Sequence, residues 1–247
     1  MVERVTLIMD CFAPGGGTLT LESVAARTAL PRSTTHRILD QLVRVGWLAH
    51  TTAGYAVGQR ALRLGGAQAV AEIRAAAVPL VQELSWRTGL VAHLGVLDGA
   101  DVRYLDKVGG PVAAALPSRV GGRVPAHTTA IGKALLAWLA PEDVDELTAG
   151  RLERTTARSI GELPALHAEL ARIRLRRGVA FESEEAVPGF ACVAAAVRGG
   201  EFAVAAISLC GPVGRTVLER VAPLVAGTAR TISARLAGEL APAANGG

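Results

Sequence analysis

The chain has 247 residues, a formal net charge of +4 at pH 7, and a composition that is 50% hydrophobic but only 4% aromatic. This length allows one large or two modest domains with cores of their own, and no apolar run is long enough to span a membrane. Three cysteines without a CxxC spacing, and an N-terminus that does not resemble a signal peptide, exclude a secreted disulfide scaffold and predict a cytoplasmic protein.

The first predicted helix covers residues 2–12, where Val5, Ile8, Met9 and Phe12 recur on one stripe. A glycine-rich loop follows. A second short helix is then predicted, because the Thr20 side chain suits its N-cap.

The third predicted helix begins at Pro31, which suits a first helical turn, and ends at Gly46. Residues expected to face inward recur at helical spacing: Thr35, Ile38, Leu42 and Val45. The opposite face is polar, and its members are basic or neutral: Arg32, Ser33, His36, Arg37, Gln41 and Arg44.

Residues 47–50 and 55–57 predict two short strands, joined by a turn in which Gly54 can adopt a positive φ. Helix, tight turn, helix and hairpin together describe a winged helix-turn-helix. In that fold the recognition helix enters the major groove of DNA with its N-terminal residues nearest the bases. The alternative is a plain helical hairpin with a solvated basic face, but the ordered series of elements favours DNA binding.

We expect double-stranded DNA to contact the third helix, the end of the preceding helix and the wing. The expected contacts are Arg27, Arg32, Ser33, Thr34, His36, Arg37, Gln41, Arg44, Thr52 and Tyr55. Charge agrees, since residues 1–66 hold seven basic and four acidic side chains, a balance of +3, while the other 181 residues balance to +1. A single domain at +3 would bind DNA weakly, so we expect a homodimer or a dimer of dimers.

Residues 58–88 predict a helical connector that is interrupted twice. Gly65 and Gly66 form an expected break or hinge. Helices are expected over 67–78 and 80–88, with Pro79 either separating them or lying in the first turn of the second helix. We place a DNA-binding domain at 1–58, a connector at 59–80 and a second domain at 81–247.

The second domain alternates strand and helix patterns, which predicts an α+β sensor domain. Strands are expected at 91–97, 102–108, 112–116, 179–183, 192–197 and 202–209, with a hairpin turn at 98–100. Helices are expected at 130–139 with a threonine N-cap, from 141, at 163–176 and at 216–240.

LTLESVAARTALPRSTTHRILDQLVRVGWL, followed by GYAVGQRALRLG, resembles the DNA-binding half of the IclR family of bacterial transcriptional regulators. The second half matches too, in VAHLGVLDGADVRYLDKV, SRVGGRVPAHTTAIGKALLAWL, EEAVPGFACVAAAVR and AISLCGP. The resemblance covers nearly the whole chain. It implies an α+β protein whose N-terminal winged helix-turn-helix is joined by a helical connector to a GAF-like effector-binding domain, with the connector contributing to dimer packing.

The resemblance also implies an effector pocket. Its polar contacts fall on the backbone of Ala130 and Ile131 and on the side chains of Glu182, Cys192, Ser208 and Cys210. Its apolar wall falls on Ala113, Leu116, Val124 and Phe190. The N–H groups of a helix N-terminus near residue 130 suit a carboxylate ligand. Two residues depart from the family pattern, since Glu182 replaces a common aspartate and Cys210 a usual serine.

Each of these residues also has an interpretation that involves no ligand binding. Glu182, Glu184 and Glu185 fit a solvated acidic loop, and the two cysteines fit inert core positions rather than a zinc site or a reversible disulfide. His127 fits a structural hydrogen-bonding role near the helix cap. We expect inert thiols and no bound metal.

Both halves together predict a ligand-responsive regulator, a repressor rather than an activator, that binds a palindromic operator and a small organic acid or aromatic metabolite. One alternative is an enzyme using Cys192 with His127, or Glu182 as a base; the chain lacks a GxSxG sequence, a phosphate-binding glycine loop and metal-ligand spacing. We therefore expect no catalytic residues and no cofactor. A constitutive nucleoid-type DNA binder is the other alternative, and it leaves the nearly neutral second domain without a purpose.

Overall fold

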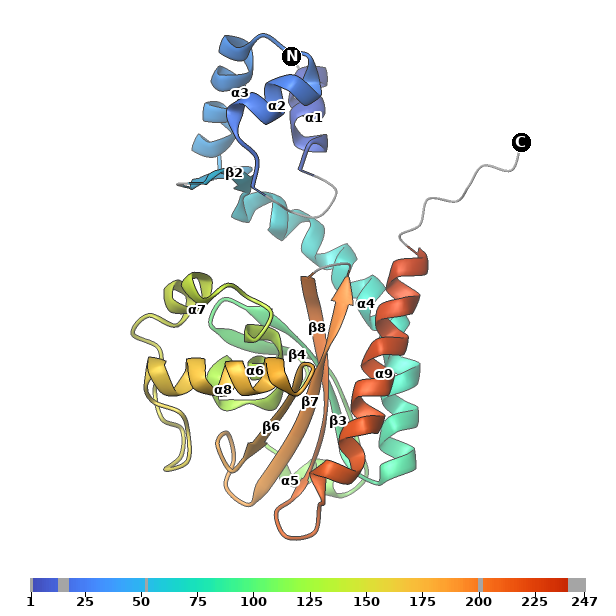
Figure 1. Ribbon diagram of the computed structural model, residues 1–247. Helices are drawn as coiled ribbons and strands as arrows, with labels where there is room; N and C mark the ends of the chain where they lie inside the picture. Colours follow the sequence, from blue (N-terminus) through green and yellow to red (C-terminus); the bar gives the residue numbers. More distant parts are fainter. Residues whose placement is uncertain (1, 13–17, 52, 200–201, 240–247) are drawn as a thin grey trace, which may run out of the picture. The chain divides into compact units, whose positions relative to one another are not determined.

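The computed structural model describes residues 2–12, 18–51, 53–199 and 202–239 (Figure 1). The chain divides into two compact units, Met1–Ala71 and Glu72–Gly247. This division lies inside the predicted connector, and the domain limits given above remain a prediction.

The first unit is a winged helix-turn-helix, as predicted. It consists of α1 (Val2–Asp10), α2 (Leu21–Thr28), α3 (Arg32–Arg44), β1 (Leu48–Thr51) and β2 (Gly54–Val57). Thr20 caps α2 by accepting a hydrogen bond from the Ser23 N–H at 3.2 Å. Ala29 turns the chain into α3 with a φ of 55°, and Gly46 ends the segment after α3 with a φ of 79°.

A small hydrophobic core holds this unit together. Its buried members are Ile8, Phe12, Val24, Ile38, Leu39, Leu42, Leu48 and Tyr55. Thr35, Ile38 and Leu42 face inward as expected. The expectation for Val45 is wrong, because it follows the last residue of α3 and is 49% exposed. Leu39, on the same side of the helix as Ile38 and Leu42, is completely buried.

Gln59–Thr88 forms one continuous helix, α4. The predicted break at Gly65-Gly66 and the predicted separation at Pro79 are therefore wrong. Glycine weakens a helix interior by about 1 kcal/mol relative to alanine, which neighbouring contacts can outweigh. Burial of apolar side chains in the second unit supplies such contacts around Pro79, from Ile73, Ala77, Val81 and Leu84.

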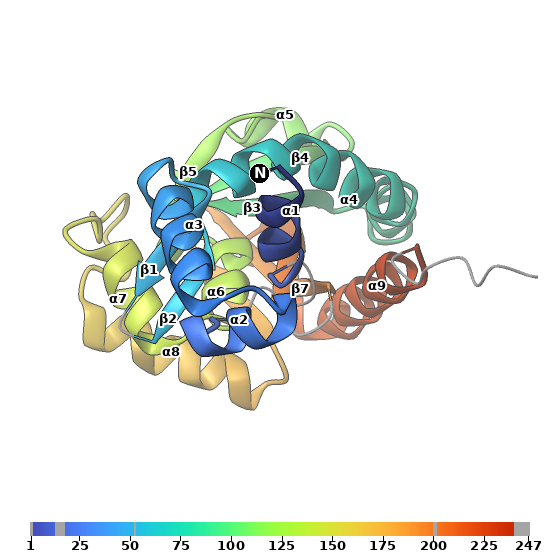
Figure 2. The same ribbon diagram turned by 90° about the horizontal axis from the view of Figure 1, so that it is seen from above.

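The second unit is built on a six-stranded antiparallel sheet with the strand order β5-β4-β3-β8-β7-β6. The strands are β3 (Val91–Asp98), β4 (Asp101–Val108), β5 (Arg123–Pro125), β6 (Val179–Ser183), β7 (Phe190–Gly199) and β8 (Phe202–Pro212). The lower part of α4 and the long α9 (Leu218–Glu239) run side by side along one face of the sheet (Figures 1 and 2).

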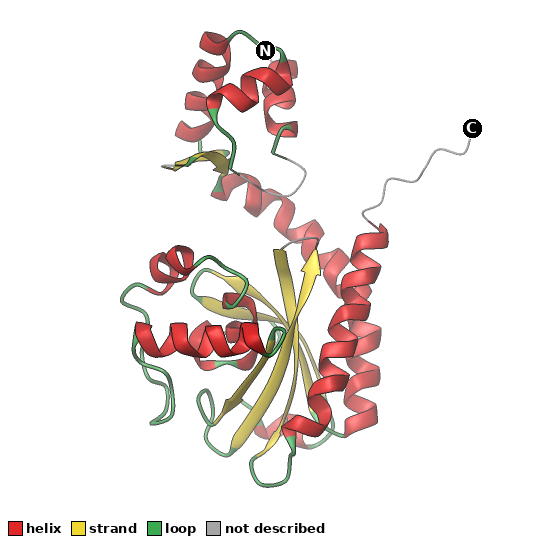
Figure 3. Ribbon diagram, viewed as in Figure 1, coloured by secondary structure: helices red, strands yellow, loops and turns green. Residues whose placement is uncertain are grey.

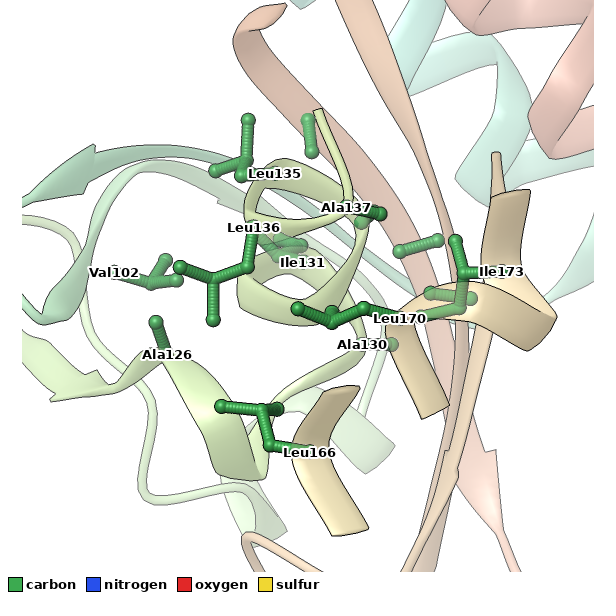
Figure 4. Packing of buried hydrophobic residues seen from close by; sticks show 14 of the residues in the cluster. Val102, Ala126, Ala130, Ile131, Leu135, Leu136, Ala137, Leu166, Leu170 and Ile173 are labelled. Carbon is green, nitrogen blue, oxygen red and sulfur yellow. The ribbon is translucent and has the colours of Figure 1, made fainter. Parts of the chain in front are cut away.

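The other face of the sheet is covered by shorter helices (Figure 3). They are α6 (Ala130–Leu136), α7 (Pro141–Thr148) and α8 (Leu163–Leu175), preceded by the 3₁₀ turn η1 (Ala126–Thr128). Every residue of α6 is buried, and Leu166, Leu170 and Ile173 of α8 pack in the same cluster (Figure 4). A Cβ on Gly132 would lie 2.1 Å from the Ala126 carbonyl oxygen, so only glycine permits this close approach.

Most of the predicted elements of this unit are present. The strand expected at 112–116 is wrong, because Val112–Ala115 forms the short helix α5, led by Pro111 with a helical φ of −54°. A short apolar run is compatible with strand or helix, and here the preceding proline starts a helical turn. The sequence interpretation missed β5, and α6 ends at Leu136 rather than at residue 139. Among the helices that the structure describes, none is long and apolar enough to cross a membrane.

Candidate functional site

The outward face of α3 carries the residues expected to meet DNA. Its exposed members are Arg32, Ser33, His36, Arg37, Gln41 and Arg44. An Arg32 guanidinium nitrogen lies 2.8 Å from the Glu22 carboxylate, and both side chains are mostly exposed. Solvent screening keeps such a surface pair weak, so Arg32 remains available to a phosphate or a base edge.

The other expected DNA contacts are placed differently. Arg27 is exposed and Thr34 is partly buried at the start of α3, whereas Thr52 lies outside the described residues. Tyr55 is only 5% exposed, and its ring packs against His50 with the centroids 4.5 Å apart. Because Tyr55 belongs to the core of the unit, its side chain does not form part of the outward surface, contrary to expectation.

The second unit encloses a cavity of about 160 Å³ between the sheet and α6. Nine of the ten residues expected at the pocket line it: Leu116, Val124, Ala130, Ile131, Glu182, Phe190, Cys192, Ser208 and Cys210. Ala113 does not line it; its side chain packs in a small hydrophobic cluster together with Leu116 and Phe190. The structure thus brings together residues from segments that are far apart in the sequence.

The pairing register of the sheet explains why polar side chains gather on this floor. Glu182 is directly opposite Cys192, which is opposite Cys210. Ser208, which lies two residues before Cys210 on β8, is opposite His93 on β3. Directly paired residues, and residues two apart on one strand, project from the same face of a sheet. The two rows therefore form one polar patch that extends across four strands.

Glu182 is buried in this patch, with an exposed fraction of 4%. Its Oε2 accepts a hydrogen bond from the Glu185 N–H at 3.0 Å, and the Cys192 thiol hydrogen-bonds to the same carboxyl group. Burial raises the pKa of Glu182 above its ordinary value, and these hydrogen bonds only partly oppose the shift. The interpretation of Glu182 as a solvated loop residue is wrong.

The two pocket cysteines form a hydrogen-bonded chain with Glu182. The hydrogen bond to Cys210, followed by burial, raises the pKa of the Cys192 thiol well above its ordinary value. A thiol held in its protonated form is a weak nucleophile, because the thiolate is the reactive species. Within the described part of the chain, no three histidine, cysteine or acidic side chains are arranged to hold a metal ion.

His93 lines the pocket but was missed in the sequence. It is 4% exposed, its Nε2 lies 2.9 Å from the Ser118 Oγ, and its ring packs against Tyr104. Burial, and then the nearby Lys107, lower the pKa of His93 to about 3, so the imidazole is neutral and offers one donor and one acceptor. The sequence signal that could have identified His93 is its position two residues after Val91 on the predicted strand, since residues two apart on a strand face the same side of a sheet.

The pocket wall formed by residues 184–187 is tied to the protein body by polar contacts. The Ser159 hydroxyl donates to the Glu185 carbonyl at 2.6 Å, and the Thr156 hydroxyl donates to the Glu184 carbonyl at 2.7 Å. The buried Lys133 of α6 places its Nζ 2.6 Å from the Glu185 Oε1. Ala186 and Val187, held in this way, line the cavity.

The N-terminus of α6 lies at the cavity wall. Thr129 is its N-cap and accepts a hydrogen bond from the Gly132 N–H at 2.9 Å. Ala130 and Ile131 carry the first two N–H groups of the helix, which have no acceptor within the helix itself. His127 is buried beside this cap, with its Nε2 3.0 Å from the Glu153 carbonyl oxygen, and it does not line the pocket. The geometry therefore supports a structural hydrogen-bonding role for His127.

Comparison with known proteins gives a match in each half of the chain. Residues 66–234 match the model of the bacterial transcriptional regulator IclR C-terminal domain, and residues 1–51 match that of the IclR helix-turn-helix domain. The chain belongs to the IclR family.

Individual relatives agree with this assignment. The chain is 36% identical to the HTH-type transcriptional regulator XynR of Escherichia coli K12 over 213 residues, which is 84% of each protein. It is 29% identical to the transcriptional repressor IclR of the same organism, over 89% of this chain and 82% of that protein. An IclR homolog from Microbacterium hydrocarbonoxydans, solved in complex with 4-hydroxybenzoate, is 27% identical with a TM-score of 0.64, covering 96% of this chain and 99% of its own.

Family membership defines the general activity. The protein is a transcriptional regulator with a DNA-binding helix-turn-helix and a C-terminal effector domain, and it is not an enzyme. The enclosed pocket lies in the unit that matches the effector domain, and the basic face of α3 lies in the unit that matches the DNA-binding domain.

Proposed function

We propose that this IclR-family protein is a repressor that binds a palindromic operator through α3 and responds to a small organic acid or aromatic metabolite. The observation that carries the proposal is an enclosed cavity with a buried polar floor, in the same chain as an exposed basic recognition helix. A regulator of bacterial promoters would act in the cytoplasm, as a homodimer or a homotetramer built as a dimer of dimers.

Cavity size limits the ligand. An apolar protein cavity of roughly 150 Å³ accepts benzene, so 160 Å³ suits a compound of about one substituted ring. Phe190, Tyr104 and the neutral His93 supply flat surfaces around such a ring. The complex of the Microbacterium relative with 4-hydroxybenzoate supports the same ligand class.

The polar contacts can accommodate a carboxylate. The N–H groups of Ala130 and Ile131 and the Ser208 hydroxyl can donate hydrogen bonds to it. No lysine or arginine is among the described residues that line the cavity. Burial raises the pKa of Glu182 above its ordinary value, which favours the neutral form of this carboxyl group and weakens its repulsion of an anionic ligand.

The proposal is tested by titrating labelled DNA from the promoter of the protein's own gene, with and without 4-hydroxybenzoate and related acids. The expected result is that one compound of this class changes DNA affinity and is recovered unchanged. Calorimetry with Glu182→Leu, which removes the polar group from the floor, should show weaker binding of that compound. If no small acid or aromatic compound binds, or if the bound compound leaves DNA affinity unchanged, the proposal is contradicted.

A further inference from the structure

A second hollow, of about 1280 Å³, lies outside the effector pocket. It runs between α9 and the segment that joins α6 to α7, and the α9 side is lined mainly by small residues: Ala226, Ala229, Ser233, Ala234 and Ala237. Its charged lining consists of four arginines, Arg174, Arg177, Arg198 and Arg230. No aspartate or glutamate is among the described lining residues, so this basic groove carries concentrated positive charge.

Two of the four arginines are held in place by neutral groups. Arg174 donates hydrogen bonds to the carbonyl oxygens of Ala137 at 2.8 Å and Leu139 at 3.1 Å. The Arg198 guanidinium stacks over the Trp138 ring at 4.5 Å from its centroid. Arg177 and Arg230 are exposed. In the described part of the chain, none of the four forms an ion pair with a carboxylate, so their positive charges are not neutralised and can attract an anionic partner.

A surface of opposite charge adjoins the groove. Helix α7 carries four exposed acidic side chains within one short segment: Glu142, Asp143, Asp145 and Glu146. Asp145 lies 2.6 Å from the His167 Nε2, whereas the other three form no ion pair with any described residue. Pro141, the first residue of α7, itself lines the groove. The basic groove and the acidic helix α7 of one molecule therefore lie next to each other.

We propose that the basic groove receives helix α7 of a second copy of this chain, in a two-fold symmetric contact. Adjacent complementary surfaces suit a two-fold axis, because each copy then donates its α7 and accepts the α7 of its partner. The alanine-rich side of α9 allows a helix to approach closely. Trp138 and the arginines are residue types that commonly dominate the energy of interfaces.

Charge reversal on the full-length protein tests this contact. The groove variant is Arg177→Glu with Arg230→Glu, and the helix variant is Glu142→Arg with Glu146→Arg. Alone, each variant places like charges opposite each other, so its self-association should weaken by more than about tenfold. When the two variants are mixed, the acidic groove of the groove variant meets the basic α7 of the helix variant. The native groove of the helix variant then meets the native α7 of the groove variant. The mixture should therefore restore the native mass in light scattering and sedimentation.

The matched control is Arg215→Glu with Arg220→Glu, which makes the same charge change at two exposed arginines that do not line the groove. The control should keep the native mass, and circular dichroism should show that all variants are folded. Native mass in both test variants would overturn the proposal. So would a mixture that fails to reassociate, which would mean that the charges do not pair. A groove variant that loses DNA affinity at native mass would instead assign the groove to nucleic acid and overturn the contact between copies.

Discussion

The Nζ of Lys133 lies 2.6 Å from the Oε1 of Glu185, and this lysine is 1% exposed. The other carboxylate oxygen of Glu185 is buried without a hydrogen-bond partner among the described residues. An ion pair this deeply buried is costly to break, because the remaining charge stays desolvated. The pair also joins the central helix α6 to the loop that walls the pocket, so its loss should affect both stability and ligand binding.

We expect Lys133→Met to lower the free energy of unfolding by roughly 3–5 kcal/mol, because Glu185 would then be buried without a counter-charge. The double variant Lys133→Met with Glu185→Gln should lose less than the single variant. Urea unfolding of the three proteins measures both values, with the exposed pair Arg87 and Glu83 as a control expected to change stability little. Equal losses in single and double variants would show that the buried charge is not the cause.

We expect Arg37→Ala to weaken operator binding by about 1–3 kcal/mol, because Arg37 lies exposed on the outward face of α3 and can form two hydrogen bonds to a guanine. Replacing a phosphate-contacting arginine would instead weaken binding to all sequences alike and reduce the salt dependence. Fluorescence titration of specific and scrambled DNA at several salt concentrations separates the two cases, with Arg215→Ala as the control. Unchanged affinity in a combined Arg32→Ala and Arg37→Ala variant would exclude this groove assignment.

Glu182 should make stability depend on pH. Burial raises its pKa above the ordinary 4.5, so the folded state holds this proton more tightly than the unfolded state does. Its contribution is therefore fully present below pH 4.5 and is lost as the pH rises through the raised pKa. Glu182→Gln cannot ionise, so the variant should gain stability relative to the parent protein as the pH rises above 4.5.

Urea unfolding at one pH below 4.5 and at one neutral pH measures the relative gain in stability of the Glu182→Gln variant. The exposed substitution Glu146→Gln is the control and should show no comparable trend. A stability difference between the Glu182 variant and the parent that is the same at both pH values would contradict the assignment of a raised pKa.

Helix α4 provides a test of coupling between the two activities. The extra Cβ of Gly66→Ala would meet no atom within 4 Å, and alanine favours a helix by about 1 kcal/mol over glycine. In the double variant with Gly65→Ala, ligand affinity should stay the same. The effect of the ligand on DNA affinity should change from that of the parent protein, for which we expect a coupling free energy of roughly 1–3 kcal/mol. An unaltered ligand effect would show that these glycines do not serve as a hinge.

Local sequence signals predicted most of the elements because they act over a few residues. Thr20 caps α2, and Gly46 and Gly99 adopt positive φ at the ends of elements. The separation expected at Pro79 failed for the opposite reason, since burial of side chains such as Val81 in the second unit outweighs the local effect of the proline.

The candidate pocket was predicted as far as the family pattern extends. Glu182, Cys192 and Cys210 line it in adjacent register positions. His93 and Ser118 were missed, because they meet only through the pairing of β3 with β4, which places Lys107 opposite His93, and through the loop that Lys107 holds. Lys107 donates to the Leu116 carbonyl at 2.9 Å and to the Ser118 carbonyl at 2.6 Å, and no local sequence pattern predicts such a contact.

The pairing of Val91 with Cys210 closes the centre of the sheet between segments more than a hundred residues apart. Contacts of such high contact order form slowly, because a long stretch of chain must be ordered before they stabilise it. The floor of the pocket depends on this pairing, so a nascent chain has no receptor site until β8 has emerged and joined β3. The effector can therefore act only on completed molecules, and its binding should favour the fully closed sheet over partly assembled ones.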